Sequence, residues 1–486
     1  MKSDRRNFIK TLAAASTLAS LPPVVNAQAP GRTGGPARRT LIKGGYVASL
    51  DPAIGELRKG DVLIEGSTIA QVGRNLSAAD AEVVDASSKL VLPGLIDTHR
   101  HCWSTILRTT VADGDFPVYF KVILQTLGPL LRPEDVYISN MLGAIGAINS
   151  GVTTVLDWSH IMNSPEYADA AIKGLADTGV RAVFAHGDPI KPFGEWWTTK
   201  STRRHPEDVR RVQKQYFTSE DQLITLAMAI RGPEASTLET SIDDIKLARE
   251  LGLRVTVHMG VPGLAGARGV TKLSEAKMLG PDITFVHTLL CTDEELQMIA
   301  ASGGTISISP ATEMLSQLGF PSLQRWKRFG LKPALSIDNE ARAPTDLFTQ
   351  MRGLLMSDRQ QEIQRAAKEG GRANLVPVRD ILDCATLQGA RVTGLERKVG
   401  SLSPGKKADI ILFDLDDVTL IPARKDPVAT MVLFGQPSHV SWVWIDGQVR
   451  KREARLVGVD INRVRKLTDA SYEFFAREGG LESSGT

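Results

Sequence analysis

Residues 89–103 read KLVLPGLIDTHRHCW and contain the first candidate functional residues of the chain. An apolar, β-branched run ends at the Pro93–Gly94 turn, and a second short strand then leads to His99 and His101. Successive residues of a strand point to opposite faces, so these two histidines point the same way. Two imidazoles on one face of a strand end can reach one metal ion. An isolated pair could equally be a surface or buried pair without function, so this interpretation depends on partners further along.

Strand-like runs alternate with helix-like patterns through the middle of the chain. The strand candidates cover residues 94–99, 152–158, 180–187, 223–230, 254–260, 283–289, 304–309 and 333–338. The helix after the sixth candidate starts with Thr292 in an N-cap position and Glu295 three residues later. Eight such units predict a (β/α)8 barrel, where the chemistry lies at the C-terminal ends of the strands. The candidate site residues at those ends are His99, His101, His258, His287 and Asp338.

Short β-type runs at both ends of the chain predict a second, smaller domain. They occupy residues 41–91 and return within residues 399–460, on either side of the barrel segment 92–398. We therefore expect an α/β protein in which a TIM-type barrel carries a small β-sandwich domain formed from both chain ends. Residues 461–486 are predicted to form a C-terminal helix and tail.

Composition limits the range of functions. The chain has 486 residues and a formal net charge of +3 with mixed signs throughout. Binding to nucleic acid would need a clustered basic face, of which this charge gives no sign, so we expect no nucleic-acid partner. Its three cysteines, Cys102, Cys291 and Cys384, are odd in number and far apart, which argues against a disulfide framework. We expect a small-molecule substrate, and the sequence leaves homo-oligomerisation open.

The N-terminus has the features of an export signal. Residues 3–10, SDRRNFIK, resemble a twin-arginine signal, and they precede a modest apolar region at 11–21 and a small-residue site that ends at Ala27. We expect recognition by the twin-arginine export machinery, cleavage after Ala27, a linker over residues 28–40 and a periplasmic location. The apolar region is far shorter than the roughly 20 residues that span a bilayer, so no stable membrane insertion is expected; an uncleaved anchor is the lesser alternative.

Several segments, in this order, resemble the amidohydrolase superfamily, in particular its cytosine deaminase-like and triazine hydrolase-like branch. Besides residues 89–103 they are GVTTVLDW (151–158), VTVHMG (255–260), FVHTLLCTDEEL (285–296), ALSIDN (334–339) and VGSLSPGKKADIILFD (399–414). The resemblance extends over nearly the whole chain after the expected signal and linker. It implies the same barrel and the same small β-domain.

The resemblance also implies roles for the site residues. It assigns a divalent metal ion to His99, His101, His258 and Asp338. Such an ion lowers the pKa of its bound water from about 15.7 toward about 7, and Asp338 is placed to take the proton as general base. His287 resembles the family histidine that hydrogen-bonds the attacking water or the substrate oxygen. Relatives with two ions use a carboxylated lysine or a glutamate from the fourth strand or a neighbour, which LITLAMAI (223–230) lacks, so we predict one ion, zinc first and iron as the alternative.

One position departs from the family pattern. Deaminases and dechlorinases of this branch usually have a glutamate three residues after the fifth-strand histidine, but here that residue is Val261. Either another acid such as Glu313 or Glu340 replaces it, or the reaction does not need protonation of a ring. The second case favours hydrolysis of a non-peptide C–N bond of the amide or cyclic amide type.

Two alternatives remain open. The first is a deaminase or dechlorinase of an N-heterocycle with a relocated general acid. The second is a non-catalytic binding module, although such relatives generally lose metal ligands that this chain retains.

Weaker candidates for substrate contact lie around the same rim. They are His160 after the second strand, Trp103 and Glu313. The long loop over residues 188–222 carries Trp196 and Trp197, and long loops at this face of a barrel are often lids.

Overall fold

The computed structural model describes residues 38–263 and 265–479. The expected export signal over residues 1–27 lies outside the described residues, as does most of the expected linker. Arg39 and Thr40, the last two residues of the expected linker, belong to the first strand, β1 (Arg39–Ala48). Within the described residues, no helix combines the length and the apolar character that crossing a membrane requires.

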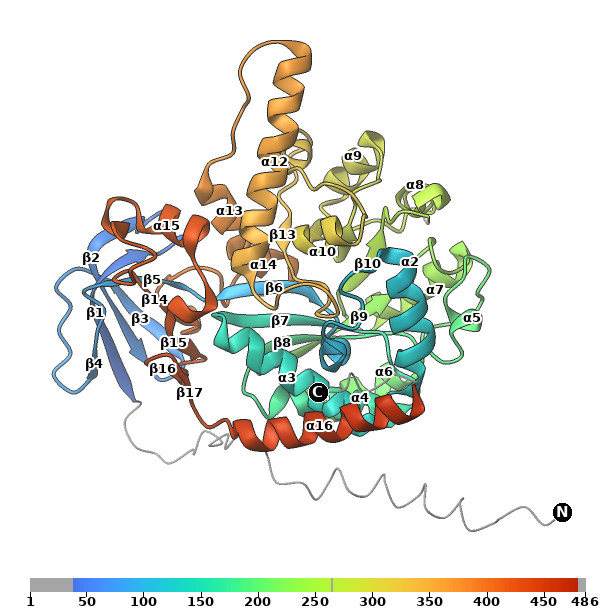
Figure 1. Cartoon of the computed structure of the whole chain (residues 1–486), viewed down its shortest axis with the longest axis horizontal. Helices are drawn as coiled ribbons and strands as arrows, with labels where there is room; N and C mark the ends of the chain where they lie inside the picture. Colours follow the sequence, from blue (N-terminus) through green and yellow to red (C-terminus); the bar gives the residue numbers. More distant parts are fainter. Residues whose placement is uncertain (1–37, 264, 480–486) are drawn as a thin grey trace.

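Eight parallel strands form the barrel (Figure 1). In order they are β6 (Leu95–Arg100), β7 (Val152–Ser159), β8 (Arg181–His186), β9 (Ile224–Ile230), β10 (Val255–Met259), β11 (Ile283–His287), β12 (Thr305–Ile308) and β13 (Ala334–Leu335). All eight residues of β7, VTTVLDWS, are buried, as expected for a parallel strand whose two faces are both covered. The predicted (β/α)8 fold class is confirmed. The last strand is shorter than the predicted run over 333–338.

Helices follow the strands and cover the outside of the barrel. They are α3 (Pro133–Asn149), α4 (Pro165–Ala176), α5 (Phe193–Trp196), α6 (Asp208–Tyr216), α7 (Leu238–Glu250), α8 (Gly269–Glu275), α9 (Asp293–Ser302), α10 (Pro310–Leu315), α11 (Leu323–Lys327), α12 (Leu347–Glu369), α13 (Val378–Cys384) and α14 (Leu387–Val392). Shorter helical segments, η2 (Cys102–Leu107), α2 (Phe116–Tyr119), η3 (Phe120–Leu127) and η4 (Gly128–Leu130), lie between β6 and α3. The predicted capping box of α9 is confirmed, because Thr292 and Glu295 each accept a hydrogen bond from the other's backbone N–H.

The turn at Pro93–Gly94 joins the two parts of the fold. β5 (Lys89–Pro93) belongs to the smaller sheet, and β6 begins one residue after Gly94. A Cβ at Gly94 would lie 2.1 Å from Oγ1 of Thr153 on β7, so only glycine permits this close approach of the chains.

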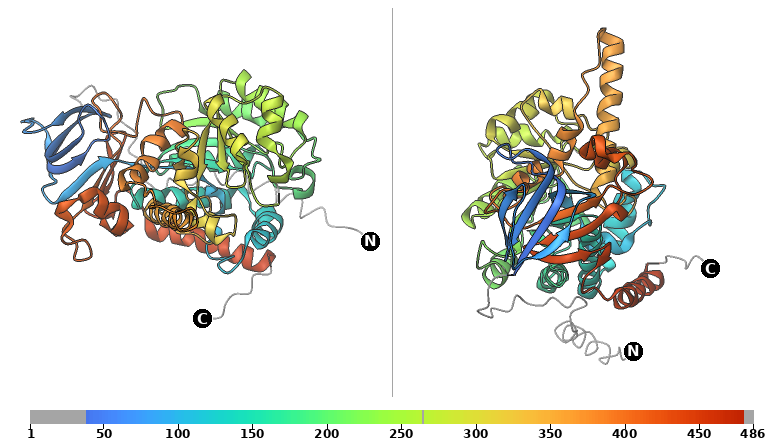
Figure 2. Two further views of the ribbon diagram at one scale, coloured as in Figure 1. Left: turned by 90° about the horizontal axis from the view of Figure 1, so that it is seen from above. Right: turned by 90° about the vertical axis from the view of Figure 1, so that its left-hand side faces the viewer.

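The smaller sheet contains nine strands from both chain ends. From the N-terminal part come β1, β2 (Glu56–Glu65), β3 (Thr68–Gly73), β4 (Glu82–Asp85) and β5, and from the C-terminal part β14 (Ile410–Asp414), β15 (Val440–Ile445), β16 (Gln448–Arg452) and β17 (Arg455–Leu456). β5 and β14 pair antiparallel and so connect the two ends. Apolar side chains from both ends, including Ile42, Ile64, Ile410 and Trp444, form a separate core here. Figure 2 shows this part beside the barrel.

The remaining C-terminal elements pack on these two parts. They are α15 (Pro427–Phe434), which follows β14, and α16 (Ile461–Glu478), which runs along the lower side of the barrel in Figure 1. Phe475 of α16 is buried, and the guanidinium of Arg132, just before α3, lies 3.8 Å from the ring centre of Phe474.

Candidate active site

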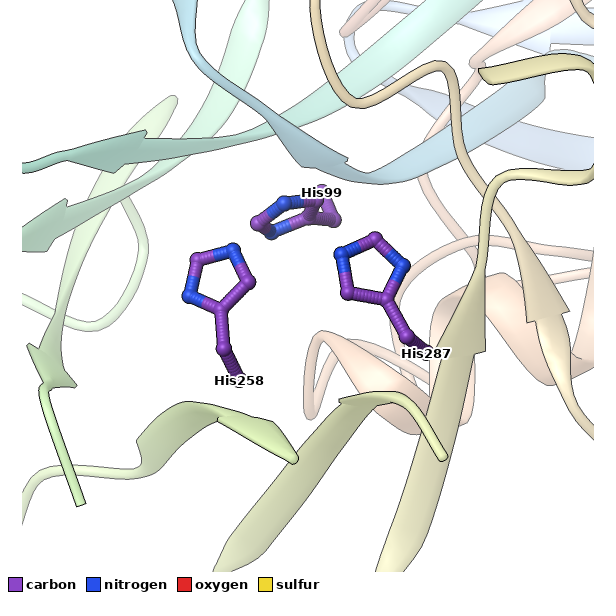
Figure 3. Close-up of side chains that lie close together, drawn as sticks. All are labelled: His99, His258 and His287. Carbon is purple, nitrogen blue, oxygen red and sulfur yellow. The ribbon is translucent and has the colours of Figure 1, made fainter. Parts of the chain in front are cut away.

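Three imidazole rings face one another at the C-terminal end of the barrel (Figure 3). His99 comes from β6, His258 from β10 and His287 from β11. One nitrogen of each lies within 4.8 Å of the others. A second group that meets the same condition contains His99, His101 and Asp338. Since both groups share His99, the five residues border one space.

Closure of the barrel brings Asp338 to this space. Its backbone N–H donates to the carbonyl of His99 at 2.9 Å, and its carbonyl accepts from the N–H of His101 at 2.7 Å. The carboxylate Oδ1 then lies 3.3 Å from Nε2 of His99 and 3.2 Å from Nε2 of His101. Asp338 has φ +67°, and His287 has φ +72°. A left-handed backbone costs a non-glycine residue about 1–3 kcal/mol and is typical of functional sites.

The surroundings fix the orientation of two rings. Nδ1 of His101 lies 2.9 Å from the carbonyl oxygen of Trp158 on β7. A carbonyl only accepts, so Nδ1 donates the proton and Nε2 is the nitrogen that faces Asp338. Nδ1 of His287 lies 3.0 Å from Oε1 of Glu313, which is buried behind it on α10. Glu313 therefore directs the other nitrogen of His287 toward the shared space.

His99 has the features of a metal ligand. It is fully buried, and neither ring nitrogen makes a hydrogen bond within the described residues. Burial lowers the pKa of His99 to about 3, with the charges of neighbouring histidines acting in the same direction. Burial likewise holds the pKa of His258 well below its usual value. These rings are neutral at pH 7, which is the form that binds a metal ion.

Asp338 supplies the negative charge of the site. Burial by itself would raise the pKa of its carboxyl, but the adjacent His101 and His99 lower that pKa well below its usual value. Asn339 adds a hydrogen bond from Nδ2 to Oδ2 at 3.2 Å. A carboxylate beside neutral imidazoles is a donor set that suits zinc and similar divalent ions.

A largely apolar cavity opens onto this group of residues. His101, His258, His287 and Asp338 form part of its wall. Opposite them, the lining residues come mainly from α2, η3 and the loop after β8, and include Phe116, Tyr119, Phe120, Leu124 and Trp197. An aromatic cavity with a few polar groups at one end is typical of a small-molecule site.

The weaker candidates divide into two groups. His160 lines the cavity, as does Val261. Trp103 does not: it is fully buried, and its indole N–H points to Nδ1 of His160 at 3.3 Å. Glu313 is also fully buried, behind His287. The expected substrate contacts of Trp103 and Glu313 therefore have no support in this geometry, because both side chains lie behind residues of the wall.

Glu340, the second acid considered as a replacement, lies elsewhere. Its carboxylate pairs with Arg108 and lies 3.4 Å from the guanidinium of Arg100, and it borders a different cavity. It is therefore paired with arginines outside the cavity that contains the histidines.

Sequence reasoning missed two charged residues of the cavity wall. Arg231 and Glu234 follow β9 directly, in the segment RGPE. Their signal was a pair of charged residues just after a barrel strand, where functional groups gather. The carboxylate lies in the turn after the fourth strand, and not in the strand itself.

Arg231 ties the long loop over residues 188–222 to the barrel. Its guanidinium lies 3.2 Å from Asp188, donates to the carbonyl of Trp196 at 2.7 Å and bonds Ser201 Oγ at 2.9 Å. Trp197 of this loop lines the cavity and donates from its indole to the carbonyl of Pro189 at 2.9 Å. The loop thus forms one side of the cavity.

Comparisons with known proteins agree with this picture. Residues 90–450 match the sequence profile described as "Amidohydrolase family". A 5'-deoxyadenosine deaminase from Methanothermobacter thermautotrophicus is 28% identical over 427 residues, which cover 86% of this chain and 95% of the deaminase.

Two solved structures share the fold. An atrazine chlorohydrolase from Arthrobacter aurescens, complexed with zinc and atraton, matches with a TM-score of 0.78 and 20% identity, over 89% of this chain and 99% of that one. An adenosine deaminase from Xanthomonas campestris with bound zinc matches with a TM-score of 0.77 and 20% identity, over 90% of this chain and 100% of that one. The expected family and enzyme class, metal-dependent hydrolases that act on C–N bonds other than peptide bonds, are thereby supported, and the chain belongs to the amidohydrolase family.

Proposed function

We propose that this protein hydrolyses a C–N bond of a small ring-containing molecule with the help of one divalent metal ion, zinc in the first place. His99, His101, His258 and Asp338 would hold the ion. The observation that carries the proposal is the convergence of these side chains, with His287, beneath an aromatic cavity at the end of the barrel. The unpartnered nitrogens of His99 support a site for a metal ion there.

The residues of the site divide the chemistry among them. A zinc ion bound here would make water nucleophilic at neutral pH. Asp338 is the base that takes a proton from the attacking water and passes it on later in the reaction. His287, oriented by Glu313, donates a hydrogen bond to the oxygen on which negative charge develops.

The cavity favours a flat, uncharged substrate. Phe116, Phe120 and Trp197 offer ring faces and edges, and Tyr119 is buried beside them. The rings of Phe120 and Phe193 meet edge to face with centroids 5.0 Å apart, so this wall is well packed. A cyclic amide or a heteroaromatic ring would match such a wall.

Deamination of an aminated heterocycle is the second candidate. It is favoured by the relatives, since the alignment with the deaminase from Methanothermobacter thermautotrophicus covers most of both chains. The two candidates differ in their product, because a deaminase releases ammonia whereas a cyclic amidase opens a ring. A dechlorinase would release chloride instead.

The first experiment measures metal content and activity together. The full chain is purified, and elemental analysis is done on it, on His258→Ala and on His186→Asn. His186 is another buried strand-end histidine, but its Nδ1 contacts His205 at 3.0 Å and it lies outside the two metal-binding groups. We expect about one zinc ion per chain in the parent and in His186→Asn, and little in His258→Ala.

The same samples are then screened for hydrolysis. Cyclic amides, 5'-deoxyadenosine and atrazine are incubated with zinc-loaded protein, and ring opening, ammonia and chloride are measured. Two ions per chain would overturn the single-ion proposal. Iron in place of zinc would overturn the choice of zinc as the bound metal. A tightly zinc-loaded protein without any of these activities would favour the binding module.

We also propose export to the periplasm through the twin-arginine machinery, from the pattern of residues 3–27. N-terminal sequencing of the protein from a periplasmic fraction should start at Gln28. Changing Arg5 and Arg6 together to lysine should leave the protein in the cytoplasm; a periplasmic double variant would contradict the proposal. The mass of the native assembly, from light scattering, decides the open question of homo-oligomerisation.

A further inference from the structure

At position 261 this chain departs from the family pattern, since valine stands where a glutamate is usual. Val261 lines the cavity and is 3% exposed, but its side chain cannot carry a proton. It follows His258 by three residues, beyond the end of β10. A reaction that protonates the substrate therefore needs an acid from another element.

Glu234 reaches this place from the neighbouring strand. It lies four residues past the end of β9, which pairs with β10, and it lines the same cavity as His258 and His287. Its two carboxyl oxygens lie 3.0 and 3.1 Å from the backbone nitrogen of Gly260, the residue directly before Val261. The main chain directly before Val261 thus holds a carboxyl group that comes from the turn after β9.

The surroundings of Glu234 suit an acid that exchanges protons. Its side chain is 3% exposed, and within the described residues it makes no salt bridge with a lysine or arginine. Burial raises the pKa of Glu234 to about 7, although the N–H groups of Gly260 and Val261 lower it. General acids work best when their pKa lies near the working pH.

The two other acids are already paired. Glu313 accepts from His287 and from the backbone of Ser309 at 3.0 Å each, and does not line the cavity. Glu340 pairs with Arg108 outside the cavity. Glu234 is the carboxylic acid, besides Asp338, that lines the cavity among the described residues.

We propose that Glu234 is the substrate-contacting proton donor of this site, in the place that Val261 leaves without an acid. This inference rests on the proposed C–N hydrolysis. Water adds through its oxygen to the carbon of the C–N bond, and Asp338 accepts one of its protons. The C–N electron pair goes to the nitrogen, which takes the proton of Glu234. Transfer of the proton from Asp338 restores Glu234 for the next cycle.

The test moves the carboxyl from one strand end to the other. In zinc-loaded protein, kcat/KM is measured for Glu234→Gln, for Glu234→Gln with Val261→Glu, and for Glu234→Gln with Val261→Leu as the matched control. We expect Glu234→Gln to lower kcat by about 100-fold and to raise KM by no more than about 10-fold, with a zinc content close to that of the parent. The glutamate at 261 should restore at least about 10-fold of this loss, and the leucine none. A Glu234→Gln variant with full kcat would overturn the proposal, as would equal rates in the two double variants.

Binding separates this inference from the proposed function. Metal-free parent and Glu234→Gln are titrated with 5'-deoxyadenosine in a calorimeter, so that no turnover is needed. We expect the variant to bind about 10-fold more weakly, because the amide N–H of glutamine is a weaker hydrogen-bond donor than the O–H of the acid. Failure of the parent to hydrolyse any C–N substrate, together with this weakening, would overturn the proposed function and leave the contact of Glu234 with the ligand standing. Equal affinity of the two proteins, or no binding by either, would overturn the role of Glu234.

Discussion

Oε1 of Glu313 lies 3.0 Å from Nδ1 of His287, and the same oxygen accepts the backbone N–H of Ser309 at 3.0 Å. Burial lowers the pKa of His287, but the hydrogen bond and the charge of Glu313 outweigh this, so that the net shift is upward. The pair resembles the carboxylate–histidine pairs that orient functional imidazoles in many enzymes. Glu313 therefore acts through His287, and not on the substrate.

Glu313→Gln should lower kcat/KM by about 10- to 100-fold, because the uncharged amide of glutamine orients the imidazole ring of His287 less firmly than the carboxylate does. The zinc content should stay unchanged, since Glu313 lies outside the metal-binding groups. Glu362→Gln is a matched control, because Glu362 is also a buried glutamate but lies on α12, paired with Arg365. Equal kcat/KM values for the parent and Glu313→Gln would show that His287 needs no partner.

Asp338→Asn tests the base directly. The amide cannot accept a proton from water, so kcat should fall by at least about 100-fold even in protein that retains zinc. The rate is therefore measured per bound zinc ion, with the metal determined in the same sample. Full hydrolytic rate in a zinc-loaded Asp338→Asn protein would make the assignment of the base wrong.

The sequence predicted the barrel and the histidines well because both follow simple rules. Strand residues alternate between faces, and functional groups of a barrel gather at the C-terminal strand ends, so the positions of His99, His101, His258 and His287 follow from short apolar runs. Asp338 also lies beside these histidines, although β13 ends at Leu335. Backbone hydrogen bonds from His101 and to His99 carry the chain three residues further along the rim.

What the sequence could not predict depends on side-chain direction outside regular strands. Trp103 lies in the short helical segment η2 and not in a strand, and its buried indole contacts His160. Glu234 lies in a turn without periodicity, and its contact with Gly260 joins residues 26 positions apart. Such contacts are set by how neighbouring strand ends pack, which no local pattern records.

Glu234→Gln should stabilise the protein at alkaline pH while it impairs catalysis. Burial raises the pKa of Glu234 from its usual 4.5 to about 7, Glu295 adds to this, and His287 opposes it. The folded state therefore binds more protons than the unfolded state between pH 4.5 and 7. The contribution of protonated Glu234 to the free energy of unfolding is fully present below pH 4.5. It is lost as pH rises through 7, by about 3 kcal/mol in total. Glutamine never ionises, so the variant escapes this loss.

The measurement is urea unfolding of metal-free parent and Glu234→Gln at pH 5 and pH 8. The free energy of unfolding of the variant, relative to the parent, should be higher at pH 8 than at pH 5. Parallel pH dependence of the two proteins would mean that folding does not shift the pKa of Glu234, and would remove the electrostatic support for its role as an acid. A gain of stability with a loss of rate is the trade-off expected at an active site.

Arg181 and Asp409 hold the barrel to the smaller sheet. Arg181 begins β8, Asp409 directly precedes β14, and their two hydrogen bonds measure 2.8 and 2.9 Å. Both side chains are almost fully buried. Asp409 also accepts the backbone N–H of Asp446 at 2.8 Å, so removal of the arginine would leave a buried carboxylate with a single backbone donor beside it. Arg181→Met should lower the free energy of unfolding by about 3–5 kcal/mol, because a buried charge loses its partner.

Two further variants make this test specific. Arg210→Met breaks an exposed pair with Glu250 and should leave stability nearly unchanged, since exposed ion pairs contribute little. Arg181→Met with Asp409→Asn should recover part of the loss, because the uncompensated charge is gone. All are compared by urea unfolding at pH 7. If Arg181→Met unfolds at the same urea concentration as the parent, the pair does not join the two parts. Other contacts, such as the hydrogen bond from Nζ of Lys451 on β16 to the carbonyl of Asn149 on α3, must then hold them together.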